Sequence, residues 1–222
     1  MNKPFFFFLC SALALLSSCQ KQEDEATALK SSQSQRPAVA IAPVIDSSES
    51  GLNWDLSDEI TYTLSSRLAQ KTKLSIADPQ RTKSQIKKVK ANSNPFGTDL
   101  SWMKTAFPGE EFVVFMELIE HHERLSDTSE NSSPEFSPAH LELGMRLRII
   151  DIRSSEPLVI LQEIIQDSHF IPRQFTSHNF TQSPWNSEEF SITPVGIAHS
   201  LLIKELSSRI EDYIFLAKSK GL

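Results

Sequence analysis

The stretch HLELGMRLRIIDIR at residues 140–153 decides the fold, because apolar and polar side chains alternate along most of it. This alternation has the period of a β-strand and predicts a strand with one buried and one solvent-facing side. SSEP at residues 154–157 predicts a turn into the apolar residues 158–165, and therefore an antiparallel hairpin. Before it, FVVFMELI at residues 112–119 is apolar on both sides in its first half, which predicts a central strand.

The remaining elements place helices around this sheet. AVAIAPVID at residues 38–46 reads as a buried strand, and LSIAD at residues 74–78 as a short second one. Helices are expected over residues 55–68, with Asp55 as N-cap, over 80–91, over 99–107 and from Thr193 to about Lys218. The sequence thus predicts an α/β (α+β) fold with a mixed five-stranded sheet, element order β-α-β-α-β-β-β-α, and helices mainly on one face.

The amino terminus carries the clearest functional signal. Lys3 precedes an apolar run at residues 5–16, which is shorter than the roughly 20 residues of a membrane-spanning helix and typical of a signal peptide. LSSC at residues 16–19 resembles the bacterial lipobox, which implies cleavage before Cys19 and its acylation by diacylglycerol and palmitate-type chains. Gln20 in place of Asp implies export to the outer membrane. The alternative is an ordinary signal peptide that leaves Cys19 as a free thiol.

Composition divides the chain into three parts. We expect a signal peptide at residues 1–18, a flexible lipid-anchored tether at residues 19–36, and one globular domain at residues 37–222. Two cysteines exclude a disulfide-rich scaffold. A formal net charge of -6 argues against nucleic acid as a partner, because binding phosphates needs clustered Lys and Arg.

The apolar strand at residues 38–46, the helix containing LSSRL at residues 64–68 and the short strand LSIAD together resemble a group of bacterial envelope proteins. The group includes the amino-terminal domain of TolB, CsgG, PelC and LpoB, and the whole chain also resembles an uncharacterised chlamydial lipoprotein. The resemblance implies an outer-membrane lipoprotein with this α/β fold. It departs from CsgG, because the mature chain offers no apolar segment for a transmembrane barrel hairpin.

The sequence contains no recognisable catalytic motif. It has neither a Gly-x-Ser-x-Gly nucleophile turn nor a phosphate-binding loop, so we expect no enzyme and no cofactor. Neighbouring residues of a strand point to opposite faces, so His121 and His122 cannot bind one ion together. We therefore expect a solvated strand end and no metal there, with a weak site at His121, Glu123 and His140 as the alternative.

Two groups of residues are candidates for binding a partner. The polar segment at residues 173–192 carries four aromatic side chains that serve either as interface anchors or to fasten the segment to its own core: Phe175, Phe180, Trp185 and Phe190. Arg146 and Arg148 lie on the predicted solvent-facing side of residues 140–153. They either bind an acidic partner or peptidoglycan carboxylates, or pair with Glu163 on the next strand.

These observations predict a lipid-anchored, non-enzymatic accessory or scaffold subunit of the cell envelope. Its domain is expected to face the periplasm and to act through envelope protein partners or self-association, with membrane contact only through its lipid. A periplasmic module for a small ligand or metal is the second hypothesis, and a cell-wall hydrolase is the third.

Overall fold

The structure, a computed structural model, describes residues 36–48, 50–89, 93–126, 137–175 and 184–220. These fall almost wholly in one compact unit, Pro37–Leu222. The predicted signal peptide, Cys19 and nearly all of the predicted tether lie outside the described residues. Among the helices of the described ranges, none has both the length and the apolar character that crossing a membrane requires.

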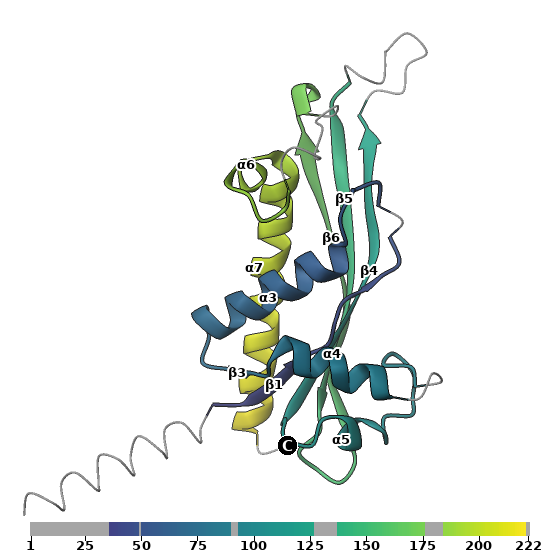
Figure 1. Cartoon of the computed structure of the whole chain (residues 1–222), viewed down its shortest axis with the longest axis vertical. Coiled ribbons are helices and arrows are strands. Elements are labelled where there is room, and N and C mark those ends of the chain that lie inside the picture. Colours follow the sequence, from purple (N-terminus) through teal and green to yellow (C-terminus); the bar gives the residue numbers. More distant parts are fainter. Residues whose placement is uncertain (1–35, 49, 90–92, 127–136, 176–183, 221–222) are drawn as a thin grey trace, which may run out of the picture. The chain divides into compact units, whose positions relative to one another are not determined.

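The described chain forms six strands and five α-helices (Figure 1). The strands and helices follow one another as β1 (Ala38–Ile41), β2 (Ile45–Asp46), α3 (Leu56–Lys71), β3 (Ser75–Ile76), α4 (Pro79–Lys88), α5 (Met103–Ala106), β4 (Phe112–Leu125), β5 (Ala139–Asp151), β6 (Leu158–Ile171), α6 (Glu188–Ser191) and α7 (Pro194–Ser219). A short 3-10 helix, Arg173–Phe175, follows β6.

The sheet is mixed, which confirms the predicted fold class. Its strand order is β3-β1-β4-β5-β6, with β1 parallel to β3 and β4, and with β4, β5 and β6 antiparallel. The sixth strand appears because the run expected as one strand over residues 38–46 divides into β1 and β2. Pro43 lies between them and has no N–H to donate to a ladder. Both pieces pair with β4 in parallel, at Val39–Ile41 and at Ile45–Asp46.

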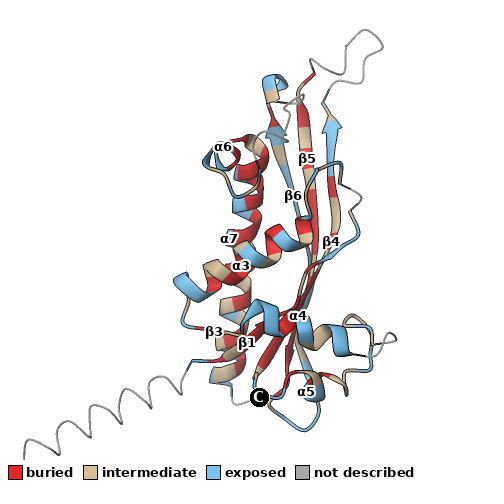
Figure 2. Ribbon diagram, viewed as in Figure 1, coloured by how far each residue is buried: buried red, intermediate tan, exposed pale blue. Residues whose placement is uncertain are grey.

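The main core lies between the sheet and the two long helices α3 and α7 (Figure 2). Asp55 caps α3 by accepting hydrogen bonds from the backbone N–H groups of Ser57 and Asp58, and Thr193 caps α7 in the same way. Along most of β4 and β5 the helix-facing side chains are buried, among them Met116, Leu118, Leu143 and Leu147. The burial of this apolar surface is the main force that holds the helices on the sheet.

A second, smaller core corrects the expectation that helices lie mainly on one face. Met103 of α5, Phe107 and Ile86 of α4 pack against Val113 and Phe115 on the opposite side of β4. The prediction therefore holds for α3 and α7 but not for α4 and α5. The continuous apolar run at the start of β4 is explained by these two cores, because both sides of that part of the strand are covered.

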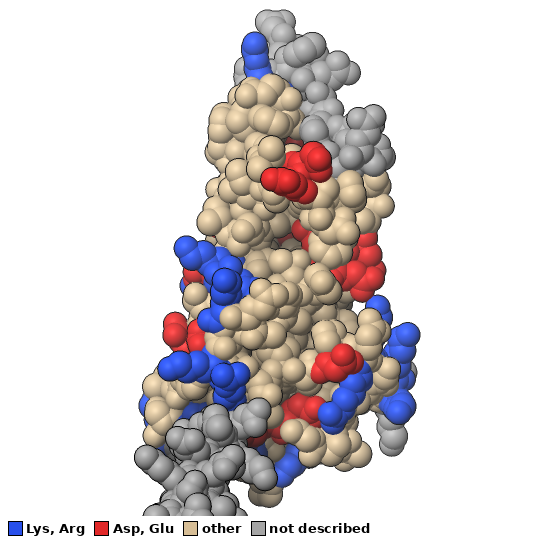
Figure 3. Space-filling model, turned by 60° about the vertical axis from the view of Figure 1, so that its left-hand side comes forward, with Lys and Arg blue, Asp and Glu red and all other residues tan. Residues whose placement is uncertain are grey.

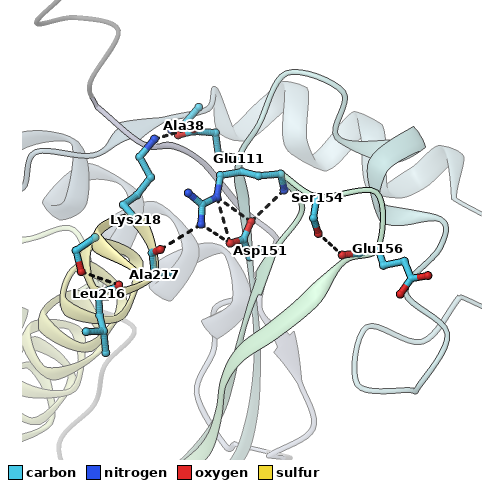
Figure 4. A network of polar contacts seen from close by, with 10 residues as sticks. Ala38, Glu111, Asp151, Ser154, Glu156, Leu216, Ala217 and Lys218 are labelled. Carbon is cyan, nitrogen blue, oxygen red and sulfur yellow. Dashed lines mark hydrogen bonds and ion pairs between the residues drawn. The ribbon is translucent and has the colours of Figure 1, made fainter. Parts of the chain in front are cut away.

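A polar cluster fastens the first strand to the last helix (Figure 4). The carboxylate of Glu111 accepts a hydrogen bond from the backbone N–H of Ala38 at 3.1 Å and one from Lys218 Nζ at 2.8 Å. Beside it, Arg153 pairs with Asp151 at 2.6 Å and donates to the carbonyl of Ala217 at 3.3 Å. The starts of β1 and β4 and the ends of β5 and α7 are therefore joined at one place.

Candidate functional site

Four polar side chains form a hydrogen-bonded row between α3, α7 and β4. Trp54 Nε1 donates to Glu59 Oε2 at 2.7 Å, and Glu59 Oε1 lies 2.7 Å from His199 Nδ1. His199 Nε2 lies 2.9 Å from His121 Nε2, which ends the row on β4. His199 was not among the predicted site residues, although it lies one turn after Val195 and near Leu202 on the buried side of α7.

Both histidines of this row are almost wholly buried, with 6% of His121 exposed. Burial, and after it the neighbouring charge of His199, lowers the pKa of His121 to about 4, so its imidazole is neutral at neutral pH. Phe190 packs against two members of the row in edge-to-face geometry. Its ring centroid lies 5.2 Å from that of Trp54 and 5.6 Å from that of His199. The row therefore acts as an internal tie that positions two helices on the sheet.

His121 is buried rather than in the solvated strand end that we expected, and a β-bulge explains the difference. The register between β4 and β5 shifts between Leu118 and Glu120, so Leu118 and His121 both face the helices despite their odd spacing. Gly144 lies opposite this bulge, where a Cβ atom would be 2.9 Å from Cβ of Glu120. A glycine inside a strand pattern was the available signal.

The same register argues against the weak metal site. His121 and Glu123 lie opposite Leu143 and Leu141, on the helix-facing side, whereas His140 lies opposite Arg124 on the other side. The three side chains thus do not converge on one point. No group of three or more His, Cys, Asp or Glu side chains suited to a metal occurs within the described part of the chain.

One side of β4, β5 and β6 faces away from α3 and α7. The part of this side that lies around residues 140–146 of β5 forms a surface that we call the open face. It contains a hollow of about 560 Å³, and the side chains of this face that line it are those of Glu120, His122, Arg124, Glu142, Gln166 and Ser168. Arg124 Nη2 lies 2.6 Å from Glu142 Oε1, and this hydrogen bond lowers the pKa of Glu142. Ile164 and Phe170 are 55% and 56% exposed on the same face.

Arg146 and Arg148 have different surroundings from those predicted. Arg148 is 7% exposed and donates to the carbonyls of Pro95 and Gly97 at 2.8 and 2.7 Å, because the chain before α5 covers it. Arg146 pairs with Glu117 at 2.9 Å and lies over the ring of Phe96. Neither pairs with Glu163, which instead binds Arg209 of α7 at 2.8 Å. A partner contact by either arginine stays a prediction.

The described aromatic residues of the 173–192 segment lie against the domain itself. Phe190 is buried in the main core, and Phe175 and Trp185 pack against that core while partly exposed. Trp185 also makes an edge contact with Tyr62 at a centroid distance of 5.8 Å. Phe180 lies outside the described residues. For the other three residues, the alternative in which they fasten the segment to its own core agrees with this packing.

These features define a mixed α/β domain whose strands have one helix-covered side and one partly open side. The chain belongs to the family of unknown function DUF7499, whose match spans residues 25–218. A comparison with curated proteins finds no match.

The predicted resemblance to a chlamydial protein is confirmed among solved structures. The hypothetical protein CT253 from Chlamydia trachomatis is 25% identical, with a TM-score of 0.63 over 81% of this chain and 98% of that one. Lipoprotein GNA1162 from Neisseria meningitidis is 10% identical, with a TM-score of 0.42 over 79% of this chain and 99% of that one. PelC from Paraburkholderia phytofirmans, a dodecamer, is 11% identical, with a TM-score of 0.41 over 78% and 86%.

Proposed function

We propose that this chain is a lipid-anchored lipoprotein of the outer membrane, acylated at Cys19. Its domain faces the periplasm and serves as a non-enzymatic accessory or scaffold subunit that works through protein contacts. The observation that carries the proposal is the order of Lys3, the apolar run at residues 5–16 and LSSC at residues 16–19. Two or three acyl chains hold a protein on a bilayer stably, because each buried methylene contributes about 0.8 kcal/mol.

The open face supports the part of the proposal that concerns protein contacts. Its exposed Ile164 and Phe170 lie beside paired charges, and this mixture of apolar and polar groups is typical of a non-obligate protein interface. Figure 3 turns the side of α6, α7 and α3 toward the viewer, and the acidic and basic groups on that side form small separate clusters without one large field of a single sign. Such a surface favours a protein over a polyanion as partner.

Metabolic labelling with a palmitate analogue tests the anchor. The full chain is expected to take up the label and to sediment with outer-membrane fragments, whereas Cys19→Ala loses the label. Cys10→Ala is the matched control, because Cys10 lies inside the run that the signal peptidase removes, and its label is expected to be unchanged. Persistent labelling of Cys19→Ala would overturn the assignment.

Site-specific photo-crosslinking in the cell envelope tests the contacts. A photoreactive amino acid at the exposed His122 of the open face is expected to give a discrete adduct with another envelope protein. The same amino acid at the exposed Lys87 of α4 is the control, and should give at most a tenth of that adduct. Equal adducts at both positions, or none at His122, would contradict a binding role for the open face.

A further inference from the structure

The long strand β6 ends the sheet with an unpaired edge. Within the described residues it pairs only with β5, so the backbone groups along its other side have no strand partner. The pairing is regular from Leu161 to Ile171, between the register shift near Ile150 and Pro172. At about 3.4 Å per residue, this stretch offers an edge of roughly 35 Å, and such long edges readily pair with another chain.

The charges along β6 oppose such pairing in some registers and permit it in others. The stretch contains no Lys, Arg or Pro, which are among the devices that prevent edge-to-edge contact, although inward-pointing charges are another such device. Its two acidic residues, Glu163 and Asp167, and its histidine, His169, all face the helix-covered side, because they lie opposite Leu147, Leu143 and Leu141 of β5. The pattern of these three residues therefore decides which register a second copy can adopt.

A twofold axis perpendicular to the sheet pairs two copies of β6 antiparallel and keeps the helix-covered sides together. Centred on Gln166, it overlaps the whole regular stretch and places Glu163 opposite His169 of the second copy. Centred on Ile165, it places Glu163 opposite Asp167, and centred on Asp167 it places that carboxylate opposite itself. Like charges directly opposite one another destabilise a sheet. The register centred on Gln166 therefore both overlaps the whole regular stretch and avoids placing like charges opposite each other.

We propose that two copies of this chain pair through β6, antiparallel and centred on Gln166, to form one continuous sheet. Ile164 of each copy lies opposite Ser168 of the other, and the exposed Ile164 and Phe170 gain shelter from the added strand. Pairing through β6 does not depend on the lipid anchor.

Disulfide trapping tests the register directly. The full chain carrying Cys10→Ala and Cys19→Ala has no thiol of its own and is purified in detergent. Gln166→Cys in this background places two thiols opposite each other across the axis, at a Cα separation that permits a disulfide. Mild oxidation is expected to convert most of it to a covalent dimer on a non-reducing gel.

Gln162→Cys is the matched control. It is exposed on the same side of β6, yet its two copies would lie about 27 Å apart in the proposed register. It is expected to form at least tenfold less dimer. Ile164→Cys and Ser168→Cys, each weak alone, are expected to form mixed dimers efficiently when the two proteins are combined. Equal trapping of Gln162→Cys and Gln166→Cys, or no trapping of Gln166→Cys, would overturn the proposal.

Sedimentation equilibrium of the chain without added cysteines gives an independent readout. Ile164→Lys introduces an edge lysine at an exposed position and is expected to weaken dimerisation at least tenfold, with an unchanged circular dichroism spectrum. Leu201→Lys, at an exposed position of α7, should leave the dimer intact. A monomer for the unsubstituted chain, or equal effects of the two lysines, would contradict pairing through β6.

Discussion

The two ends of β4 and β5 lie in different surroundings. Around Phe112–Met116 the strand is covered on both sides, by the main core and by the smaller core beneath α4 and α5. Around Glu120–Leu125 only one side is covered, and the other forms the open face. The comparison shows that the same strand provides stability at one end and an accessible surface at the other. Substitutions at matched positions can separate the two contributions.

Leu147→Ala tests the covered side and has the largest expected effect. Leu147 is fully buried against the helices, so loss of its methyl groups and the resulting cavity should lower the free energy of unfolding by about 3 kcal/mol. Arg146→Ala, one residue earlier and on the other side, removes a partly exposed ion pair and should cost less than about 1 kcal/mol. Urea denaturation measures both, and equal costs would refute the assigned sides.

Acid tests the buried row of Trp54, Glu59, His199 and His121. The unfolded chain binds a proton at His121 below about pH 6.5, whereas the fold resists it until about pH 4, so acid favours the unfolded state. The free energy of unfolding should therefore fall as the pH drops from 6.5 to 4, by on the order of 3 kcal/mol. Denaturation of His121→Gln across this range should show a much shallower fall, and the same slope in both would contradict a neutral buried imidazole.

Arg148→Met tests the cover that the chain before α5 places on the sheet. Loss of two hydrogen bonds to the carbonyls of Pro95 and Gly97 should lower stability by about 1–2 kcal/mol and speed amide exchange around residues 95–102. Arg124→Met, which breaks an exposed pair on the open face, is the control and should cost at most about 0.5 kcal/mol. Unchanged exchange around residues 95–102 in Arg148→Met would show that this cover is held by other contacts.

The sequence predicted the sheet better than it predicted the site, for reasons visible at particular residues. Alternation along residues 140–153 identified the helix-covered side of β5 correctly, because burial on one side leaves a period of two. It missed His121, since the bulge after Leu118 reverses the alternation and its one sign in the sequence, Gly144, lies on the neighbouring strand. His199 and Glu59 were also missed, because they belong to different helices and lie 140 positions apart in the sequence.

The spacing of apolar residues along a helix does not by itself decide which of them are buried, because this also depends on what packs against the helix. Leu201 and Leu202 are neighbouring apolar residues of α7, yet Leu201 is 45% exposed and Leu202 is buried, because the sheet covers only part of that helix. The cover on Arg148 was equally invisible to the sequence, since it depends on carbonyl groups of Pro95 and Gly97 rather than on any side chain. Contacts made by backbone atoms leave no mark on local patterning.

The cluster around Glu111 has a mechanical consequence. β1 is the first strand of the described residues, and Glu111 holds the first N–H of that strand together with Lys218 near the end of α7. Since β1 lies between two parallel neighbours, a pull on residue 37 along the strand loads its hydrogen bonds with β3 and β4 together, in shear rather than one by one. The attachment point of the preceding segment is thus reinforced against tension by both ends of the domain.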